Sequence, residues 1–572
     1  MSISTILVAN RGEIAERVFA TAKDMGLRCV AVYSEADANS SFVNTADLAV
    51  HIPGYLDGEA IIAAALKTEA DAIHPGYGFL SENAEFAQAV TDAGLIWIGP
   101  SPKVIKSMGD KIEAKKAAVD AKVPILPSSD DPMAGDDVGY PLLVKAAAGG
   151  GGKGMHVVQS SKDLSEAVES AQREALKSFG DDRVFIERYV PSSHHIEIQI
   201  LGDSHGNLIH LGERECSIQR RHQKIIEEAP SPTIDSELRN SIAEAALNLA
   251  KTIGYESTGT VEFLLDHDSK DFFFLEVNTR LQVEHPVTEE TTGIDLVRQQ
   301  ILVAQGEKME CTQESISSDG HSIEARLYAE DPSNNFLPAI GTLSAFKVPE
   351  NPNIRWDVGV SKGTEVGVQF DPMLAKVTSK GSTRKEAALR LAKALEELHL
   401  GGITTNREFL ISTLRHEAFL AGDTTTDFIE RHSPNNSNFL TSDEISRAAA
   451  IAALWIQGEN RSAALVLDQT PSGWRNSRFP DQQISFTSGD VQYDVAYHSK
   501  RDGSFTLNGI DRTRVHRHSP NDIDVEIDGI RSTHLVTRAK DEIFIQIDRG
   551  TAHLSIIPHF ITPGTNEVAD GL

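Results

Sequence analysis

Residues 261–286 have the sequence VEFLLDHDSKDFFFLEVNTRLQVEHP, in which two apolar runs are separated by a polar turn. The runs, residues 261–265 and 272–275, have the length and composition of the two strands of an antiparallel hairpin. Pairing them across the turn places Glu262 opposite Glu276 on one face. Two carboxylates about 5 Å apart repel by roughly 3 kcal/mol at an effective dielectric constant of about 20, so a positive group is expected between them. A divalent cation with oxygen ligands, Mg²⁺ or Mn²⁺, fits this position.

The second run leads into a row of polar residues at every second position: Glu276, Asn278, Arg280, Gln282 and Glu284. In an extended chain these five side chains share one face. A solvated edge strand also alternates, and strand carboxylates often only face solvent. This row instead follows a buried apolar run and contains two acids, two amides and one cation. Such a composition favours a site for a metal, an anion and a base.

A glycine-rich loop follows a predicted strand that ends at Lys145. Its four consecutive glycines are Gly149, Gly150, Gly151 and Gly152. Without Cβ atoms, their backbone N–H groups can approach phosphate oxygens closely. The loop is not a Walker motif, because Lys153 precedes a glycine and a strand pattern begins at Met155. The alternative is a flexible hairpin turn.

A basic segment at residues 220–224, RRHQK, stands out in an acidic chain. The chain has 54 Lys and Arg against 83 Asp and Glu, a formal net charge of −29. That charge repels a phosphate backbone, so neither nucleic acid nor an anionic membrane is an expected partner. The segment is a candidate anion site, although charge runs are usually solvated loops.

Length and cysteine content predict a multidomain protein, and a reducing cytoplasm fits the few cysteines. Its 572 residues are enough for three or four domains. The three cysteines, Cys29, Cys216 and Cys311, have no metal-ligand spacing and predict neither a disulfide framework nor a zinc site. We also expect no targeting segment and no membrane span.

The chain divides into four expected regions. Residues 1–111 alternate short strands with helical patterns and predict a parallel α/β domain. Residues 112–190 form a smaller lid, and residues 191–440 form the largest domain, with a mixed pattern. Residues 441–572 begin with an Ala-rich helix and continue as short strands, which predicts an antiparallel sheet or barrel packed with a helix. Its turn signals are Asp502-Gly503, Asn508-Gly509, Asp528-Gly529 and Arg549-Gly550.

Several long segments together resemble the ATP-grasp enzymes and, within them, biotin carboxylase. They are residues 8–15, 74–83, 108–111, 145–154, 213–224, 276–286 and 324–326. The resemblance extends over residues 3–435 in order and without large gaps. The fold it implies is an N-terminal α/β domain followed by an ATP-grasp lid and central domain.

The resemblance implies roles for individual residues. ATP contacts are Lys111, Lys145, Gly149 to Gly152, His195, Gln219, His222 and Lys224. Glu187, Arg188 and Val190 belong to the hinge that holds adenine. Metal ligands are Glu262, Glu276 and Asn278. Bicarbonate contacts are Arg280, Gln282, the backbone of Val283, and Lys224.

The resemblance also implies a reaction. Glu284 matches the general base that deprotonates bicarbonate, whose oxygen attacks the γ-phosphate of ATP to give carboxyphosphate. Carboxyphosphate yields CO2 and phosphate, and the phosphate takes the proton from N1′ of biotin. Arg326 matches the guanidinium that stabilises the biotin enolate. Arg280 and Lys224 complete the expected catalytic set.

Residues from about 441 resemble, less specifically, the domain that docks the α subunit of an acyl-CoA carboxylase onto a carboxyltransferase subunit. Residues 471–476, PSGWRN, are the best local match. A carrier domain with a biotinylated Lys between two Met residues is not found in the sequence, so we expect the carrier to be cut away or a separate chain. The expected partners are therefore a carboxyltransferase, a biotin carrier and further copies of this chain.

Three alternatives remain. Another ATP-grasp ligase would share the lid and metal carboxylates but lack the row from Arg280 to Glu284 joined to Arg326. A fragment of a pyruvate or urea carboxylase would share the first 440 residues in kind. A non-catalytic scaffold subunit is disfavoured because every matched position keeps a competent side chain. The acyl-CoA that a partner carboxylates is not specified by this chain.

Overall fold

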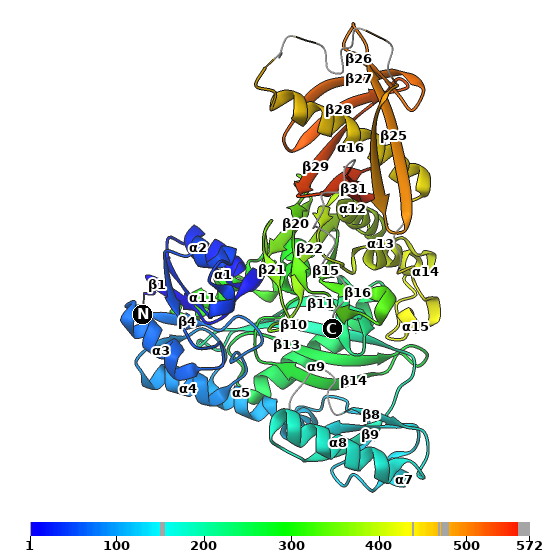
Figure 1. Cartoon of the computed structure of the whole chain (residues 1–572). Helices are drawn as coiled ribbons and strands as arrows, with labels where there is room; N and C mark the ends of the chain where they lie inside the picture. Colours follow the sequence, from blue (N-terminus) through cyan, green and yellow to red (C-terminus); the bar gives the residue numbers. More distant parts are fainter. Residues whose placement is uncertain are drawn as a thin grey trace.

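The computed structural model describes residues 2–148, 155–436, 440–466, 470, 477 and 480–558 (Figure 1). The glycine run Gly149 to Gly152 and the segment 471–476 lie outside the described residues. In the part of the chain that is described, every helix is too short or too polar to span a lipid bilayer.

The N-terminal unit is a five-stranded parallel sheet in the order β3-β2-β1-β4-β5, which confirms the predicted parallel α/β domain. Its strands are β1 (Thr5–Val8), β2 (Arg28–Tyr33), β3 (Leu48–His51), β4 (Ala72–His74) and β5 (Ile96–Trp97). Its helices are α1 (Gly12–Asp24), α2 (Ser41–Thr45), α3 (Gly58–Lys67), α4 (Ala84–Asp92) and α5 (Pro102–Gly109). Ile6 and Val8 share a core with α1, while Leu7 shares one with α3 and α4. Both faces of β1 are covered, which explains its unbroken apolar run.

A four-stranded antiparallel sheet in the order β6-β9-β7-β8 forms the smaller second unit. Helix α6 (Lys111–Asp120) precedes it. Its elements are β6 (Ser128–Ser129), α7 (Gly135–Val138), β7 (Leu142–Ala146), β8 (His156–Val158), α8 (Leu164–Phe179) and β9 (Val184–Arg188). Helix α8 packs its apolar side chains, Leu164, Val168 and Ala171, on this sheet. The glycine-rich segment therefore connects two paired strands, β7 and β8, as predicted.

The third and largest unit is built on an eight-stranded sheet in the order β14-β13-β10-β11-β12-β15-β22-β20. Its first strands are β10 (Ser193–Gly202), β11 (Leu208–Arg220), β12 (Gln223–Ala229), β13 (Ser257–Asp266) and β14 (Phe272–Asn278). The others are β15 (His321–Tyr328), β20 (Ile354–Val358) and β22 (Met373–Gly381). Its paired strands are antiparallel throughout.

Helices and short ladders complete this unit. The helices are α9 (Ser236–Ile253), α10 (His285–Thr292), α11 (Leu296–Ala304), α12 (Arg384–Glu397), α13 (Arg407–Arg415), α14 (Glu417–Ala421) and α15 (Phe428–His432). The short strands are β16 (Glu330–Asp331), β17 (Leu337–Pro338), β18 (Gly341–Thr342), β19 (Ala345–Lys347), β21 (Glu365–Val366) and β23 (His399–Gly401). Helices α12 and α13 share one core with β15 and β22.

The last unit is a closed antiparallel barrel with a long helix, which confirms the predicted barrel and helix. Helix α16 (Ser442–Ser462) shares one core with the barrel side chains. The strands are β24 (Gln482–Ser488), β25 (Val491–Ser499), β26 (Ser504–Leu507), β27 (Ile510–Ser519), β28 (Asp522–Ile527), β29 (Ile530–Ala539), β30 (Glu542–Ile547) and β31 (Gly550–Ile557). Three of the predicted turn signals lie between consecutive strands, and the fourth, Arg549-Gly550, lies where β31 begins. At Asn508-Gly509 and Asp528-Gly529 both residues have positive φ, as two-residue hairpin turns require.

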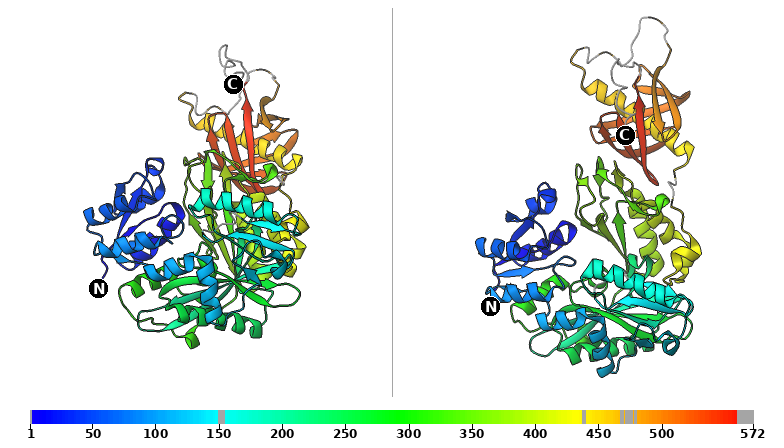
Figure 2. Two further views of the ribbon diagram at one scale, coloured as in Figure 1. Left: turned by 90° about the horizontal axis from the view of Figure 1, so that it is seen from below. Right: turned by 60° about the horizontal axis from the view of Figure 1, so that its bottom comes forward.

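The barrel lies at the opposite end of the molecule from the second unit (Figure 1). In both views of Figure 2, the N-terminal unit in blue and the barrel in orange and red remain apart, each beside the green central sheet. The barrel contacts the third unit through hydrogen bonds and through packing of the Phe544 ring against Gly401. Gln546 donates to the Glu396 carbonyl at 2.7 Å, and the Leu400 amide donates to Thr551 at 3.1 Å.

Candidate functional site

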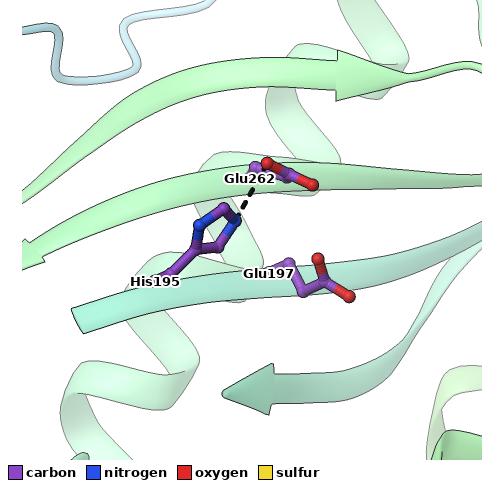
Figure 3. Close-up of side chains that lie close together, drawn as sticks. All are labelled: His195, Glu197 and Glu262. Atoms are coloured by element: carbon purple, nitrogen blue, oxygen red, sulfur yellow. Dashed lines mark ion pairs between the residues drawn. The ribbon is translucent and has the colours of Figure 1, made fainter. Parts of the chain in front are cut away.

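The candidate site is built on one face of the central strands β10 and β13. Alternation along β10 places His195, Glu197 and Gln199 on this face, while the intervening isoleucines pack toward α9 on the other face. Glu197 is the register partner of Glu262 on β13. Figure 3 shows the His195 ring directed toward Glu262, with the Glu197 side chain farther along the same strand.

The predicted hairpin register is confirmed: Glu262 on β13 is paired with Glu276 on β14. A basic side chain lies beside each of these carboxylates. Nε2 of His195 is 2.9 Å from Oε2 of Glu262, and Nζ of Lys111 is 3.6 Å from Oε2 of Glu276. Burial raises the pKa of Glu262, but the charges of Lys224 and His195 outweigh it and hold this pKa well below its usual value.

The expectation of one extended row from Glu276 to Glu284 is wrong. Strand β14 ends at Asn278, and the chain turns before helix α10, whose N-cap is Glu284. Pro286 at the start of α10 favours this helix start, because its ring presets the helical φ angle and its missing N–H is not needed there. The five polar residues therefore do not share a strand face.

The loop nevertheless brings the same side chains together around Glu262. Asn278 Nδ2 donates to Glu262 Oε1 at 2.8 Å, and Gln282 Nε2 donates to the same oxygen at 3.2 Å. Arg280 donates to Gln282 Oε1 at 2.9 Å and to Asn278 Oδ1 at 3.1 Å. Its Nε donates to Glu82 of the N-terminal unit at 2.9 Å. The convergence is produced by hydrogen bonds within a loop.

Glu284 is fully buried between two cations. Lys224 Nζ donates to its Oε1 at 2.7 Å, and Arg326 NH2 donates to its Oε2 at 2.8 Å. Burial raises the pKa of Glu284, but Lys224, Arg326 and Arg214 together outweigh burial and leave the pKa well below its usual value. Glu284 is therefore ionised at neutral pH, which is the form that a base requires, and the two cations at the same time lower its affinity for a proton.

Lys224 is the central cation of this cluster. Its Nζ also donates to Glu197 Oε2 at 2.6 Å and to Glu262 Oε1 at 2.8 Å. Burial lowers the pKa of Lys224, but these three carboxylates outweigh it and raise the pKa well above the usual value. In the basic segment 220–224, Lys224 is thus paired with carboxylates, whereas Arg221 is exposed. Arg220 also pairs with Glu330, at 3.1 Å.

Helix α6 and the second unit each contribute one lysine to a buried carboxylate, Glu187. Lys115 Nζ donates to Glu187 Oε2 at 2.6 Å, and Lys145 Nζ donates to Glu187 Oε1. Strand β9 ends at Arg188, and Val190 follows in the segment that leads to β10. Lys145 and Glu187 therefore lie together at the end of the predicted hinge.

The turn between β11 and β12 places His222 near the same group. Burial lowers the pKa of His222, and the nearby charges of Lys145 and His195 lower it further. Gln219 on β11 is the register partner of Lys224 on β12. The residues of the expected ATP set that the structure describes thus come from helix α6, the second unit and the central sheet with its β11–β12 turn.

We predict that Glu187→Gln destabilises the chain at neutral pH and flattens its acid sensitivity. Burial raises the pKa of Glu187, but Lys145 and Lys115 outweigh it and lower the pKa to about 2. This carboxylate therefore stabilises the fold above its unfolded pKa, by roughly 3 kcal/mol, and the stabilisation is lost as the pH falls from about 4.5 to 2. Removing the charge leaves two buried lysines without a counter-ion, at a cost of about 3–5 kcal/mol.

Thermal melts followed by circular dichroism between pH 7 and pH 3 measure both effects. Glu113→Gln is the control, because Glu113 forms an exposed pair with Lys116 at 2.8 Å. This control should leave stability nearly unchanged, because exposed ion pairs contribute little. If the melting temperature fell equally steeply with decreasing pH in the wild type and in Glu187→Gln, the prediction would be contradicted.

The donor set fits a divalent cation with oxygen ligands. Two carboxylates, Glu262 and Glu276, come from neighbouring strands in register, and Asn278 adds an amide two residues along. Basic side chains already lie beside these two carboxylates: Lys111, Lys224 and His195. They offset the repulsion between the carboxylates, as a bound cation would. Hard cations prefer such oxygen ligands.

Several site residues were not predicted from the sequence. Arg214 is fully buried and donates to Glu197, Gln199, Thr260 and Thr288. Glu227 accepts from Arg326 Nε at 2.5 Å. The available signal for Glu197 was its place between isoleucines in a strand, where a charged residue must share a face with His195. The partners of Arg214 come from three separate elements, β10, β13 and α10, and have no comparable local signal.

Comparison with protein families matches successive parts of the chain. "Biotin carboxylase, N-terminal domain" matches residues 2–105, and "Carbamoyl-phosphate synthase L chain, ATP binding domain" matches residues 110–312. "Biotin carboxylase C-terminal domain" matches residues 324–431. "Methylcrotonyl-CoA carboxylase, alpha-subunit, BT domain" matches residues 442–559. The fold and site thus define a chain with an ATP-binding domain between two biotin carboxylase domains.

Similar proteins and solved structures agree with the family matches. The chain is 47% identical over 442 residues to Biotin carboxylase 2 of Bacillus subtilis, covering 75% of this chain and 99% of that protein. It is 46% identical to the mitochondrial methylcrotonoyl-CoA carboxylase subunit alpha of Arabidopsis thaliana, covering 81% of this chain and 64% of that subunit. The biotin carboxylase domain of Hydrogenobacter thermophilus 2-oxoglutarate carboxylase is 42% identical, with a TM-score of 0.74 over 76% of this chain and 98% of that domain. The chain belongs to the biotin carboxylase family.

Proposed function

We propose that this chain carboxylates biotin at the expense of ATP and bicarbonate, as the biotin carboxylase component of an acyl-CoA carboxylase. The observation that supports this most directly is the position of Glu284. Its carboxylate lies between Lys224 and Arg326, and Lys224 also contacts Glu262. A base, an anion-binding cation and a metal-type carboxylate therefore meet at one point.

The proposed nucleotide site lies between the second unit and the central sheet. Lys111, Lys145 and His222 would contact phosphates, and the segment from Glu187 to Val190 would hold adenine. Glu262, Glu276 and Asn278 would hold Mg²⁺ or Mn²⁺, which neutralises phosphate charge when bound. The related H. thermophilus domain was solved with MgADP and bicarbonate.

In the proposed reaction, Glu284 accepts the proton of bicarbonate. A bicarbonate oxygen then attacks the γ-phosphorus of ATP, the bond to the bridging oxygen breaks, and ADP leaves as carboxyphosphate forms. Arg280, Gln282 and the Val283 backbone would hold the bicarbonate, and Glu82 keeps the Arg280 side chain in place. The work of these residues is chiefly orientation and charge neutralisation.

Arg326 would act on biotin in the second half of the reaction. Carboxyphosphate separates into CO2 and phosphate, phosphate takes the N1′ proton of biotin, and the enolate attacks CO2. Arg326 is fixed by two carboxylates, Glu227 and Glu284. A guanidinium held in this way is preorganised for a developing oxyanion.

ATP cleavage by the purified chain tests the proposal. We expect phosphate release that needs bicarbonate and increases when free biotin is added, with carboxybiotin as the product. Without a linked carrier, the response should require high added biotin, because a tether supplies an effective concentration of about a millimolar. Cleavage indifferent to both compounds would favour another ATP-grasp ligase, and no cleavage would favour a scaffold subunit.

The barrel and its helix support a proposal about partners. Their family model comes from a methylcrotonyl-CoA carboxylase alpha subunit, and the relatives include a propionyl-CoA carboxylase alpha chain of Ruegeria pomeroyi. The chain spans 64% of the plant subunit's length, so the whole carboxylase activity belongs to this proposal. We propose a carboxyltransferase subunit, a biotin carrier and further copies of this chain as partners, measurable by native mass of the purified complex.

A further inference from the structure

We propose that Lys376 is a positioning residue that orients the Val283–Glu284 peptide and ties it to helix α1 of the N-terminal unit. This inference rests on the proposed function, because Glu284 and the Val283 backbone are its base and part of its bicarbonate site. Lys376 is on β22 and belongs to none of the motifs in the resemblance. Among the described residues, its polar contacts are with Val283, Glu13 and Asp357, none of which belongs to the proposed nucleotide site.

The Lys376 ammonium group is completely buried and has partners from three segments. Its Nζ donates to the Val283 carbonyl oxygen at 3.0 Å. It also lies 3.3 Å from Glu13 Oε2 and 3.6 Å from Asp357 Oδ2. A buried ammonium is retained only with such compensation, so these contacts hold its position closely.

The bond to Val283 acts directly on the loop that precedes the base. A peptide group is planar, so fixing the Val283 carbonyl also fixes the direction of the Glu284 N–H. The preceding carbonyl, of Gln282, accepts from His285 Nδ1 at 2.8 Å. Both carbonyls before Glu284 therefore have side-chain donors, and the loop is held from outside as well as by α10.

Glu13 brings the N-terminal unit into this arrangement. It lies in the first turn of α1, is buried, and has Lys376 as its ion-pair partner. The backbone on either side is packed tightly: a Cβ added at Gly359 would lie 2.7 Å from the Glu13 amide nitrogen. Helix α1 is thus seated directly on the segment that follows β20.

A second tie connects α1 with α10 itself. Arg17 NH2 donates to Glu289 at 2.9 Å, and Arg355 NH1 donates to the other Glu289 oxygen at 2.7 Å. Arg355 also pairs with Asp357 at 3.0 Å, and Asp357 is the same carboxylate that lies 3.6 Å from Lys376. The start of α10, where Glu284 is the N-cap, is therefore held relative to α1 at two places.

This arrangement predicts a specific kinetic signature. Loss of the Lys376 charge should let the Val283–Glu284 peptide reorient. That change should weaken bicarbonate binding and slow bicarbonate deprotonation. The proposed nucleotide residues Lys111, Lys145 and Glu187 have other partners and should keep their positions. A displacement of about 1 Å in a catalytic group can cost about a hundredfold in rate.

Lys376→Met tests the inference in the full chain, since Met has a similar length without charge. We expect kcat of bicarbonate-dependent ATP cleavage to fall about tenfold to a hundredfold and KM for bicarbonate to rise several-fold, with KM for ATP nearly unchanged. Glu13→Gln should give the same pattern to a smaller degree. The double variant should lose less than the product of the single losses, because both changes act through one contact.

Lys380→Met is the matched control, because Lys380 is on the same strand but is partly exposed and pairs with exposed Asp319 at 3.1 Å. Its kinetic constants should match those of the wild type. Two results would overturn the inference. One is a folded Lys376→Met variant whose KM for bicarbonate equals that of the wild type. The other is a Lys376→Met variant in which KM for bicarbonate and KM for ATP rise equally. If Lys376→Met fails to fold, Glu13→Gln is judged by the same two KM values. A wild type without bicarbonate-dependent cleavage would instead overturn the proposed function, and this inference with it.

Discussion

Replacing Glu284 with Gln is expected to lower bicarbonate-dependent ATP cleavage about a thousandfold while leaving ATP binding nearly unchanged. The amide occupies the same space but cannot accept the bicarbonate proton. Lys224 keeps its contacts with Glu197 and Glu262, so the cation remains in the site. Arg326 likewise keeps its contact with Glu227.

Phosphate release measures the loss, and calorimetric titration with a non-hydrolysable ATP analogue measures binding. Glu290→Gln is the matched control: Glu290 is on α10 beyond the site, where its Oε1 is 3.6 Å from Arg355. It should retain most of the wild-type rate. Turnover by Glu284→Gln at the wild-type rate would show that another group is the base.

Removal of residues 441–572 is expected to abolish association with a carboxyltransferase subunit while carboxylation of free biotin remains measurable. The B. subtilis relative is matched over 99% of its length by only 75% of this chain, so a chain of that extent exists as a protein. The cut precedes α16, whose N-cap is Thr441. The proposed catalytic residues all lie before it.

The truncated chain does lose some contacts. His399 pairs with Thr537 at 3.0 Å, and the Phe544 ring packs where a Cβ at Gly401 would lie. We therefore expect a modest decrease in stability together with retained activity. Size-exclusion chromatography with the carboxyltransferase subunit measures association, and carboxybiotin formation shows that the truncated chain is folded. Assembly of the truncated chain would contradict the docking role of the barrel.

Sequence patterns were sufficient to predict structure in the hairpin and in the barrel turns, where a short segment determines its own conformation. The Glu262–Glu276 pairing followed from two apolar runs and one turn, because register in a hairpin depends on neighbouring residues. The barrel turns followed from residues such as Asn508-Gly509, which tolerate positive φ. The resemblance to biotin carboxylase in turn named residues from segments far apart in the chain.

The extended row is not formed because β14 ends at Asn278 and Pro286 favours a helix start, although the polar residues between them alternate. The sequence shows which polar side chains follow β14, but the turn and its hydrogen bonds decide how they meet.

What the sequence by itself determined is therefore the hairpin, the parallel and barrel units, and the types of side chain available for the site. Only the tertiary structure decided that Arg280 is held by Glu82, that Arg214 holds Glu197, and that Lys376 reaches Val283. Glu13 and Lys376, for example, have no periodicity or spacing in common. A buried charge takes whichever opposite charge the packed units place beside it, because leaving it unpaired costs several kcal/mol, and that choice is made by packing between distant segments.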